Sequence, residues 1–282
     1  NRRQRTARGN RWDQRGRKRN NTGQFVAAGT VGFLGLAIFA FFIWQNVTSP
    51  KITVDKETLC PDKVESVTAV LLDATDELSA VQREDIRNRL DSIKEELPIH
   101  GRIDLYALGD NRDGMARKLF SMCNPGSGKE ADALSQNPRL MKQRWTKDFS
   151  IRLNEELSRA LAAKPSSESP IMEAIKDVAV QSFGAATTVG ATEKKLIVAS
   201  DMIQFTASFN QYQGGSNLDF DVFAKSAYYQ KVRTDHLRGV NVDLFYVRRP
   251  TAKGVSGSKE HMLFWERFFR GSGGRLSLFA PI

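Results

Sequence analysis

The chain has 282 residues, 40% of them hydrophobic, and a formal net charge of +10. Its two cysteines exclude a disulfide-dense scaffold, and its length favours one substantial core with appendages. The charge is concentrated at one end, because residues 1–24 hold nine arginines or lysines and one aspartate. We therefore expect a basic, disordered tail over residues 1–24. The rest of the chain is nearly neutral, so nucleic acid is not an expected partner of the folded part.

The next segment is a candidate membrane anchor. Residues 25–44 read FVAAGTVGFLGLAIFAFFIW, without a charged side chain. A helix of this length would span roughly 30 Å, the thickness of the hydrocarbon core of a bilayer. The basic flank predicts a cytoplasmic N-terminus, which places the remainder outside the inner membrane, in the bacterial periplasm. Ala28 and Gly32 have the spacing at which small residues allow close helix packing, so a second copy of the chain is one candidate partner.

Residues 45–65 are expected to be a polar linker that contains the first cysteine. Disulfides persist outside the cytoplasm, so we expect Cys60 and Cys123 to pair. Cys60 precedes the first expected core strand, and Cys123 follows a later one. The alternative is two buried free thiols.

The remaining elements alternate between strand and helix patterns. Ser79 has the character of a helix N-cap, and Gln82 stands where a capping-box partner belongs. Apolar runs predict strands over residues 67–72, 103–108, 118–122, 195–200, 240–247 and 276–279. Helices are predicted over residues 79–97, 141–163, 171–183, 220–234 and 261–269. This order predicts an α/β fold over residues 66–282, a doubly wound and mostly parallel sheet with helices on both faces.

Polar residues follow two of the apolar strands directly. In a doubly wound sheet of strand order 3-2-1-4-5-6, the first and fourth strands are neighbours where the order reverses, and ligands bind at their carboxyl ends. Asp73 and Asp201 would then be adjacent, and Ser169 would add a hydroxyl from a loop at the same edge. Clustered carboxylates need a proton or a cation, and such oxygens suit Mg²⁺ or Mn²⁺. The sequence therefore predicts a metal site at this edge.

The same residues carry a family resemblance. Asp73-Ala74-Thr75-Asp76-Glu77 follows the first strand, SPIMEAI contains Ser169 before a helix, and IVASD ends in Asp201. In this order they resemble the metal-ion-dependent adhesion site of a von Willebrand factor A domain, whose first motif is Asp-x-Ser-x-Ser. The resemblance implies a metal-ligand set of Asp73, Thr75, Glu77, Ser169 and Asp201. Glu77 departs from the motif, because it replaces a serine with a longer, charged side chain, and a site without metal stays open.

The resemblance implies a binding module and not an enzyme, because an acidic side chain of a partner completes the metal shell in that family. We expect a membrane-anchored component of a bacterial envelope complex that binds another protein. One alternative is a metal-free structural scaffold of a membrane machine. A further alternative is a Mg²⁺-dependent phosphohydrolase, because Asp73 is similar to the nucleophile of haloacid-dehalogenase phosphotransferases. Against it, their second aspartate is Thr75 here, and Arg248 and Arg249 stand where a later acidic pair is expected.

Overall fold

The computed structural model describes residues 35–44, 53–109, 116–129, 137–163, 165–252 and 254–282. The chain divides into two units, Asn1–Ile52 and Thr53–Ile282. In the first unit, residues 35–44 are helical and exposed, while the expected basic tail and residues 25–34 of the expected anchor lie outside the described residues. Within the described ranges, none of the helices combines the length and the apolar character that crossing a membrane requires. The anchor therefore stays a prediction.

The second unit contains one six-stranded sheet, whose strand order is β3-β2-β1-β4-β5-β6. All neighbouring strands are parallel except β2 and β3, which are antiparallel. This arrangement confirms the predicted strand order. From β1 the chain adds strands toward one edge of the sheet, and from β4 it adds them toward the other edge. The strands are β1 (Ser66–Asp73), β2 (Arg102–Leu108), β3 (Arg117–Cys123), β4 (Glu193–Ser200), β5 (Asn241–Tyr246) and β6 (Arg275–Pro281).

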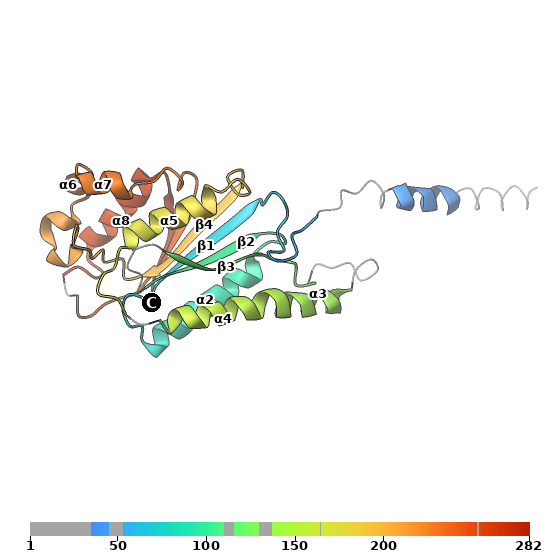
Figure 1. The fold of residues 1–282 in the computed structure, drawn as a ribbon, viewed down its shortest axis with the longest axis horizontal. Helices are drawn as coiled ribbons and strands as arrows, with labels where there is room; N and C mark the ends of the chain where they lie inside the picture. Colours follow the sequence, from blue (N-terminus) through green and yellow to red (C-terminus); the bar gives the residue numbers. More distant parts are fainter. Residues whose placement is uncertain (1–34, 45–52, 110–115, 130–136, 164, 253) are drawn as a thin grey trace, which may run out of the picture. The chain divides into compact units, whose positions relative to one another are not determined.

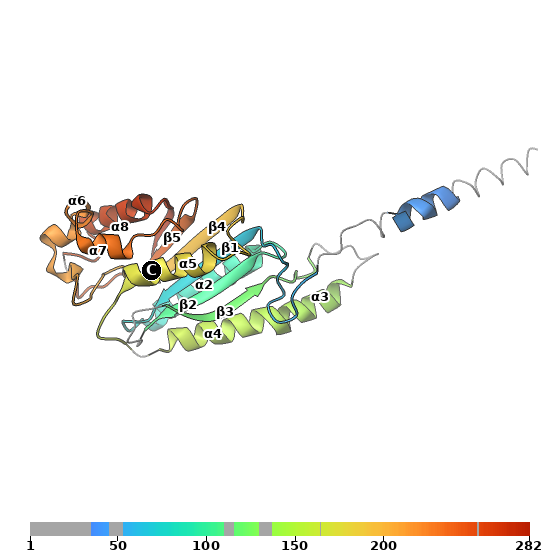
Figure 2. The ribbon, with the colours of Figure 1, turned by 45° about the horizontal axis from the view of Figure 1, so that its top comes forward.

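Helices cover both faces of this sheet (Figures 1 and 2). Side chains of the central strands alternate between two hydrophobic clusters, so that Leu71 packs on one face and Leu72 on the other. The first cluster includes buried residues of α5 (Ile171–Phe183) and α8 (Lys259–Gly271). The second includes those of α2 (Ala80–Glu96) and α4 (Ile151–Leu161). Burial on both faces explains why the central strands read as continuous apolar runs.

The capping box that begins α2 is formed as predicted. The Ser79 side chain accepts a hydrogen bond from the backbone N–H of Gln82, and the Gln82 side chain accepts one from the backbone N–H of Ser79. These two bonds satisfy backbone donors that the first helical turn leaves unpaired. They fix where the chain turns from the end of β1 into the helix.

Two predicted helices differ from the structure in detail. The helix expected over residues 141–163 consists of α3 (Pro138–Arg144), a π-helical segment (Trp145–Ser150) and α4. The helix expected over residues 220–234 is divided into α6 (Phe220–Phe223) and α7 (Ala227–Val232). The division has a local cause, because Ser226 adopts an extended conformation and its side chain caps α7 by accepting from the backbone N–H of Tyr229.

The disulfide between Cys60 and Cys123 is confirmed. The backbone N–H of Cys123 also donates to the carbonyl oxygen of Thr58 at 2.8 Å. Together, these bonds join the segment before β1 to the end of β3. Residues 53–65, expected as part of a linker, therefore lie in the same compact unit as the sheet.

Candidate functional site

The carboxyl ends of β1 and β4 meet at one edge of the sheet. Leu72 pairs with Ala199 in the parallel register of these strands, so Asp73 and Ser200 follow at the same level. Asp201 is the next residue along the chain. The structure thus brings the two predicted carboxylates to one edge, where the strand order reverses and where open α/β sheets bind ligands.

Asp73 is buried and accepts three hydrogen bonds. Its Oδ1 accepts from the backbone N–H of Thr75 at 3.0 Å and from the Thr75 hydroxyl at 2.6 Å. Its Oδ2 accepts from the hydroxyl of Ser200 at 2.6 Å. Ser200 is not among the residues predicted for the site, although the expected pairing of β1 with β4 places it beside Asp73. Both oxygens of Asp73 are therefore used within the protein.

Ser169 joins this group from the loop before α5. Its hydroxyl oxygen lies 3.0 Å from that of Thr75. Reciprocal backbone hydrogen bonds with Phe205, of 2.7 and 3.0 Å, fix its position. Asp73, Thr75 and Ser169, three of the five candidate metal ligands, therefore form one continuous buried polar network; their role as metal ligands stays a prediction.

Asp201 has a cationic partner that is not among the residues predicted for the site. Its Oδ1 accepts from the backbone N–H of Ile203 at 2.9 Å, and its Oδ2 accepts from Nε of Arg249 at 3.0 Å. Arg249 follows β5, which pairs in parallel with β4. The signal in the sequence was the arginine pair directly after LFYV, because the carboxyl end of a third parallel strand belongs at the same edge.

The electrostatics of the two carboxyl groups are coupled. Burial raises the pKa of Asp73, and the hydrogen bonds from Ser200 and Thr75 only partly offset this. Burial and the nearby charge of Asp73 raise the pKa of Asp201 to about 7, against the opposing effects of the Ile203 N–H and Arg249. The pair therefore holds a proton more tightly than two isolated carboxylates would.

The donor set does not fit the implied Mg²⁺ or Mn²⁺ while Arg249 occupies its position. Asp201 already has a cationic partner, and Glu77 is exposed and contacts Arg249 through its backbone carbonyl oxygen. No cluster of three or more carboxylate, histidine or cysteine side chains that could hold a metal occurs among the described residues. The metal stays a prediction from the resemblance, and the function proposed for this edge does not depend on it.

An exposed pair of aromatic rings lies beside this network. The rings of Phe205 and Tyr212 meet edge to face with centroids 5.7 Å apart, and the two residues are 36% and 45% exposed. Burial and then the negative charges of Asp201 and Asp76 raise the pKa of Tyr212 to about 12. Phe209 from the same loop instead stacks on Phe264 and other rings of the core. We refer to Phe205 and Tyr212 as the aromatic rim.

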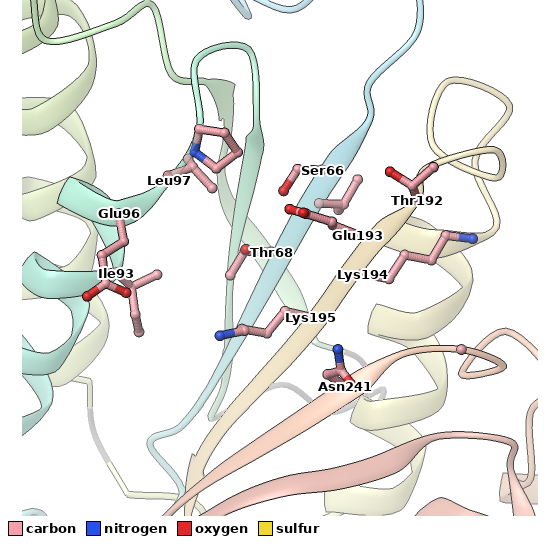
Figure 3. Close-up of a pocket in the computed structure, with 13 residues that line it drawn as sticks. Ser66, Thr68, Ile93, Glu96, Leu97, Thr192, Glu193, Lys194, Lys195 and Asn241 are labelled. Carbon is pink, nitrogen blue, oxygen red and sulfur yellow. The ribbon is translucent and has the colours of Figure 1, made fainter. Parts of the chain in front are cut away.

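A hollow of about 340 Å³ lies at the other end of the strands, away from the carboxyl edge. Glu96 of α2 and Lys195 of β4 line it from different elements (Figure 3). Lys195 already pairs with Asp243 at 3.4 Å. This hollow is at the amino ends of the parallel strands, where the fold does not place ligand sites, and it lacks a buried polar network of the kind found at the carboxyl edge.

Of the histidines, His261 is fully buried near the carboxyl edge, consistent with a packing role. Its Nδ1 lies 3.1 Å from the Tyr246 hydroxyl, and its Nε2 lies 2.9 Å from the carbonyl oxygen of Met202 and 3.0 Å from Nε1 of Trp265. Burial lowers the pKa of His261 to about 4. The ring is therefore neutral at pH 7 and supports the backbone next to Asp201.

Comparison with known proteins gives a fold-level likeness only. No family model matches the chain, and no curated protein does. Among solved structures, the chain is similar to the crystal structure of the conserved hypothetical protein BatB from Bacteroides thetaiotaomicron. The TM-score is 0.41 at 10% sequence identity, and the match covers 77% of this chain and 91% of that chain. The six-stranded α/β sheet with helices on both faces fits a Rossmann-like or von Willebrand A-like fold.

Proposed function

We propose that the chain is a membrane-anchored, non-enzymatic module of a bacterial envelope complex, and that it binds another protein at the carboxyl edge of its sheet. The observation that carries this proposal is the aromatic rim. It places two exposed rings directly beside a rigid polar network, and the Phe205 backbone is itself hydrogen-bonded to Ser169. Aromatic side chains are enriched at protein interfaces, because they combine a large apolar area with few rotatable bonds.

Two features support a periplasmic location for the folded unit. The uncharged segment 25–44 after a basic flank supports a single-pass anchor with a cytoplasmic N-terminus. The disulfide between Cys60 and Cys123 supports an oxidising location for the folded unit. Both are consistent with a domain on the periplasmic side of the inner membrane.

The contacts of the carboxylates disfavour a catalytic role. Both oxygens of Asp73 accept hydrogen bonds within the buried network, and burial raises its pKa, which disfavours the charged form that a nucleophile needs. No described contact favours the phosphohydrolase alternative. The network instead connects the loop after β1 to Ser169 and, through its backbone, to Phe205 of the rim.

Site-specific crosslinking tests the proposal. The full chain is expressed in its native host with a photoreactive benzoylphenylalanine at position 212, or at Val189 as the matched control. Val189 is 61% exposed and lies in the loop before β4, at the other end of the strands. We expect one discrete protein adduct from position 212 and none from position 189. The adduct should be lost when Phe205→Ala is added. Equal adducts from both positions, or none from position 212, would refute the proposed binding edge.

A metal-free structural scaffold of a membrane machine is the second candidate, and the ion pair between Asp201 and Arg249 favours it. Such a scaffold contacts its neighbours without a divalent ion, as the proposed module does, whereas the adhesion site of the resembled family requires one. The same crosslinking with a membrane-permeant chelator separates metal-free binding at this edge from cation-dependent binding. Loss of the adduct with chelator, and its recovery with Mg²⁺, would indicate a cation-dependent module.

A further inference from the structure

Arg249 connects three loops at the carboxyl edge. Its Nε donates to Asp201 after β4, and its Nη1 donates at 2.6 Å to the carbonyl oxygen of Glu77 in the loop after β1. Its Nη2 lies 3.8 Å from a carboxylate oxygen of Asp76 in that same loop. The backbone N–H of Arg249 donates to the hydroxyl of Ser256, which fixes the loop after β5 itself. The guanidinium therefore contacts two of the three segments that hold the implied metal ligands, the loops after β1 and β4.

The side chain of Arg249 is only 17% exposed, and that of Asp201 is 2% exposed. For a divalent ion to bind Oδ2 of Asp201, the guanidinium would have to leave it. That would leave a largely buried positive charge next to the incoming ion. Breaking a buried ion pair by removing one partner is strongly destabilising, and a second cation nearby adds repulsion.

We propose that Arg249 is the resident cation of this edge and takes the place of a divalent metal ion. It forms an ion pair with Asp201 and positions the loops after β1, β4 and β5. This inference deepens the proposed function, because it implies that the edge recognises its partner without a metal ion. Arg249 is a positioning residue, since its donors are directed at groups of its own chain.

Two measurements on the purified full-length chain test this without any partner, so their failure is distinct from failure of the proposed function. The first is titration with Mn²⁺ alone, followed by water-proton relaxation, in the wild type and in Asp201→Asn. We expect no Mn²⁺ binding that depends on Asp201, even at millimolar Mn²⁺. Saturable binding in the wild type that Asp201→Asn abolishes would overturn the inference. Mn²⁺ bound equally by both proteins lies elsewhere, and the second measurement then decides.

The second measurement is a thermal double-mutant cycle with Arg249→Met and Asp201→Asn. Arg249→Met leaves the carboxylate pair without its cation, and we expect a melting temperature lower by roughly 4–10 °C. Adding Asp201→Asn removes one of the charges that Arg249 neutralises, so the double variant should recover at least about half of that loss.

Arg248→Met is the matched control, because this exposed arginine is the neighbour of Arg249 and makes no side-chain hydrogen bond described at the site. It should leave the melting temperature unchanged. If Arg249→Met is as stable as the wild type, or if Asp201→Asn gives no recovery in the double variant, Arg249 is not the resident cation.

Discussion

Asp201→Asn should change how the stability of the domain depends on pH. The substitution keeps a carbonyl oxygen that can accept from Ile203 and Arg249, and it removes the titrating group. In the wild type, burial and the charge of Asp73 raise the pKa of Asp201 from its ordinary value of 3.8 to about 7. Between these values, the folded protein binds more protons than the unfolded chain does. Its stability should therefore fall as the pH rises from about 4 to about 7.

The size of the effect follows from the same two values. A tenfold difference in proton affinity corresponds to about 1.4 kcal/mol. Between pH 5 and pH 8, a group with these two pKa values contributes a loss of about 2.5 kcal/mol in the free energy of unfolding. Asp201 shares its proton affinity with Asp73, so this figure describes the coupled pair.

Urea unfolding followed by tryptophan fluorescence between pH 5 and pH 8 measures the difference. His261 acts in the opposite direction, because its pKa is lowered to about 4 and its contribution is lost as the pH falls below 6.5. His261 is present in both proteins, so its contribution largely cancels when the profile of the Asp201→Asn variant is subtracted from that of the wild type. Asp235→Asn, which removes a carboxylate that is 71% exposed, is the matched control and should leave the wild-type profile unchanged.

One result would refute this reasoning. If the wild type and Asp201→Asn lose the same free energy of unfolding between pH 5 and pH 8, the carboxylate pair does not hold a proton in the folded state. If the wild type instead gains free energy of unfolding over this range relative to the variant, the predicted pH dependence has the wrong sign. That outcome would mean that the Arg249 ion pair outweighs burial at Asp201.

Three further variants test what stabilises the folded unit. Replacing Cys60 and Cys123 by serine should cost about 4 kcal/mol, because the bridge closes a loop across a sequence separation of 63 residues; unchanged urea unfolding would contradict this. Asp104→Ala should cost about 3–5 kcal/mol, because it leaves the buried Arg102 without its 2.8 Å partner, and a melting curve like that of the wild type would show that the pair contributes nothing. Phe149→Ala should cost about 3–5 kcal/mol through the cavity it opens, with m unchanged in urea; a loss below about 1 kcal/mol would show that the core collapses around it.

The strands themselves could be predicted because their signal is local. The central strands β1, β2 and β4 are largely buried apolar runs, and Ser79 with Gln82 marks the helix that follows β1. The division of the 220–234 segment was less visible. Its apolar spacing is helical throughout, and only the conformation of Ser226 shows that the chain restarts. Capping by a serine within a helical pattern is a weak signal, because serine also occurs inside helices.

The candidate site was predicted in part, for a physical reason. Asp73 and Asp201 each follow a strand, so the topology alone brings them to one edge. The cation that pairs with Asp201 was not identified, because Arg249 follows a third strand and the direction of its side chain depends on the loop that Ser256 holds. Sequence motifs therefore predict which side-chain oxygens lie at the carboxyl edge of the sheet. They do not predict which cation binds them.

The choice between a metal ion and an arginine has consequences for recognition. A divalent ion leaves coordination positions open, and a partner can fill them with its own oxygen. The guanidinium of Arg249 instead directs its Nε and Nη1 donors at Asp201 and at the carbonyl oxygen of Glu77. A partner bound at this edge would therefore meet the aromatic rim and the exposed carboxylate of Glu77, while most donors of Arg249 are already bonded within the chain. Burial is the main cause of the raised pKa of Tyr212, and the charges of Asp201 and Asp76 add to it against that of Arg249. Those nearby carboxylates favour an apolar or basic segment of a partner over an acidic one.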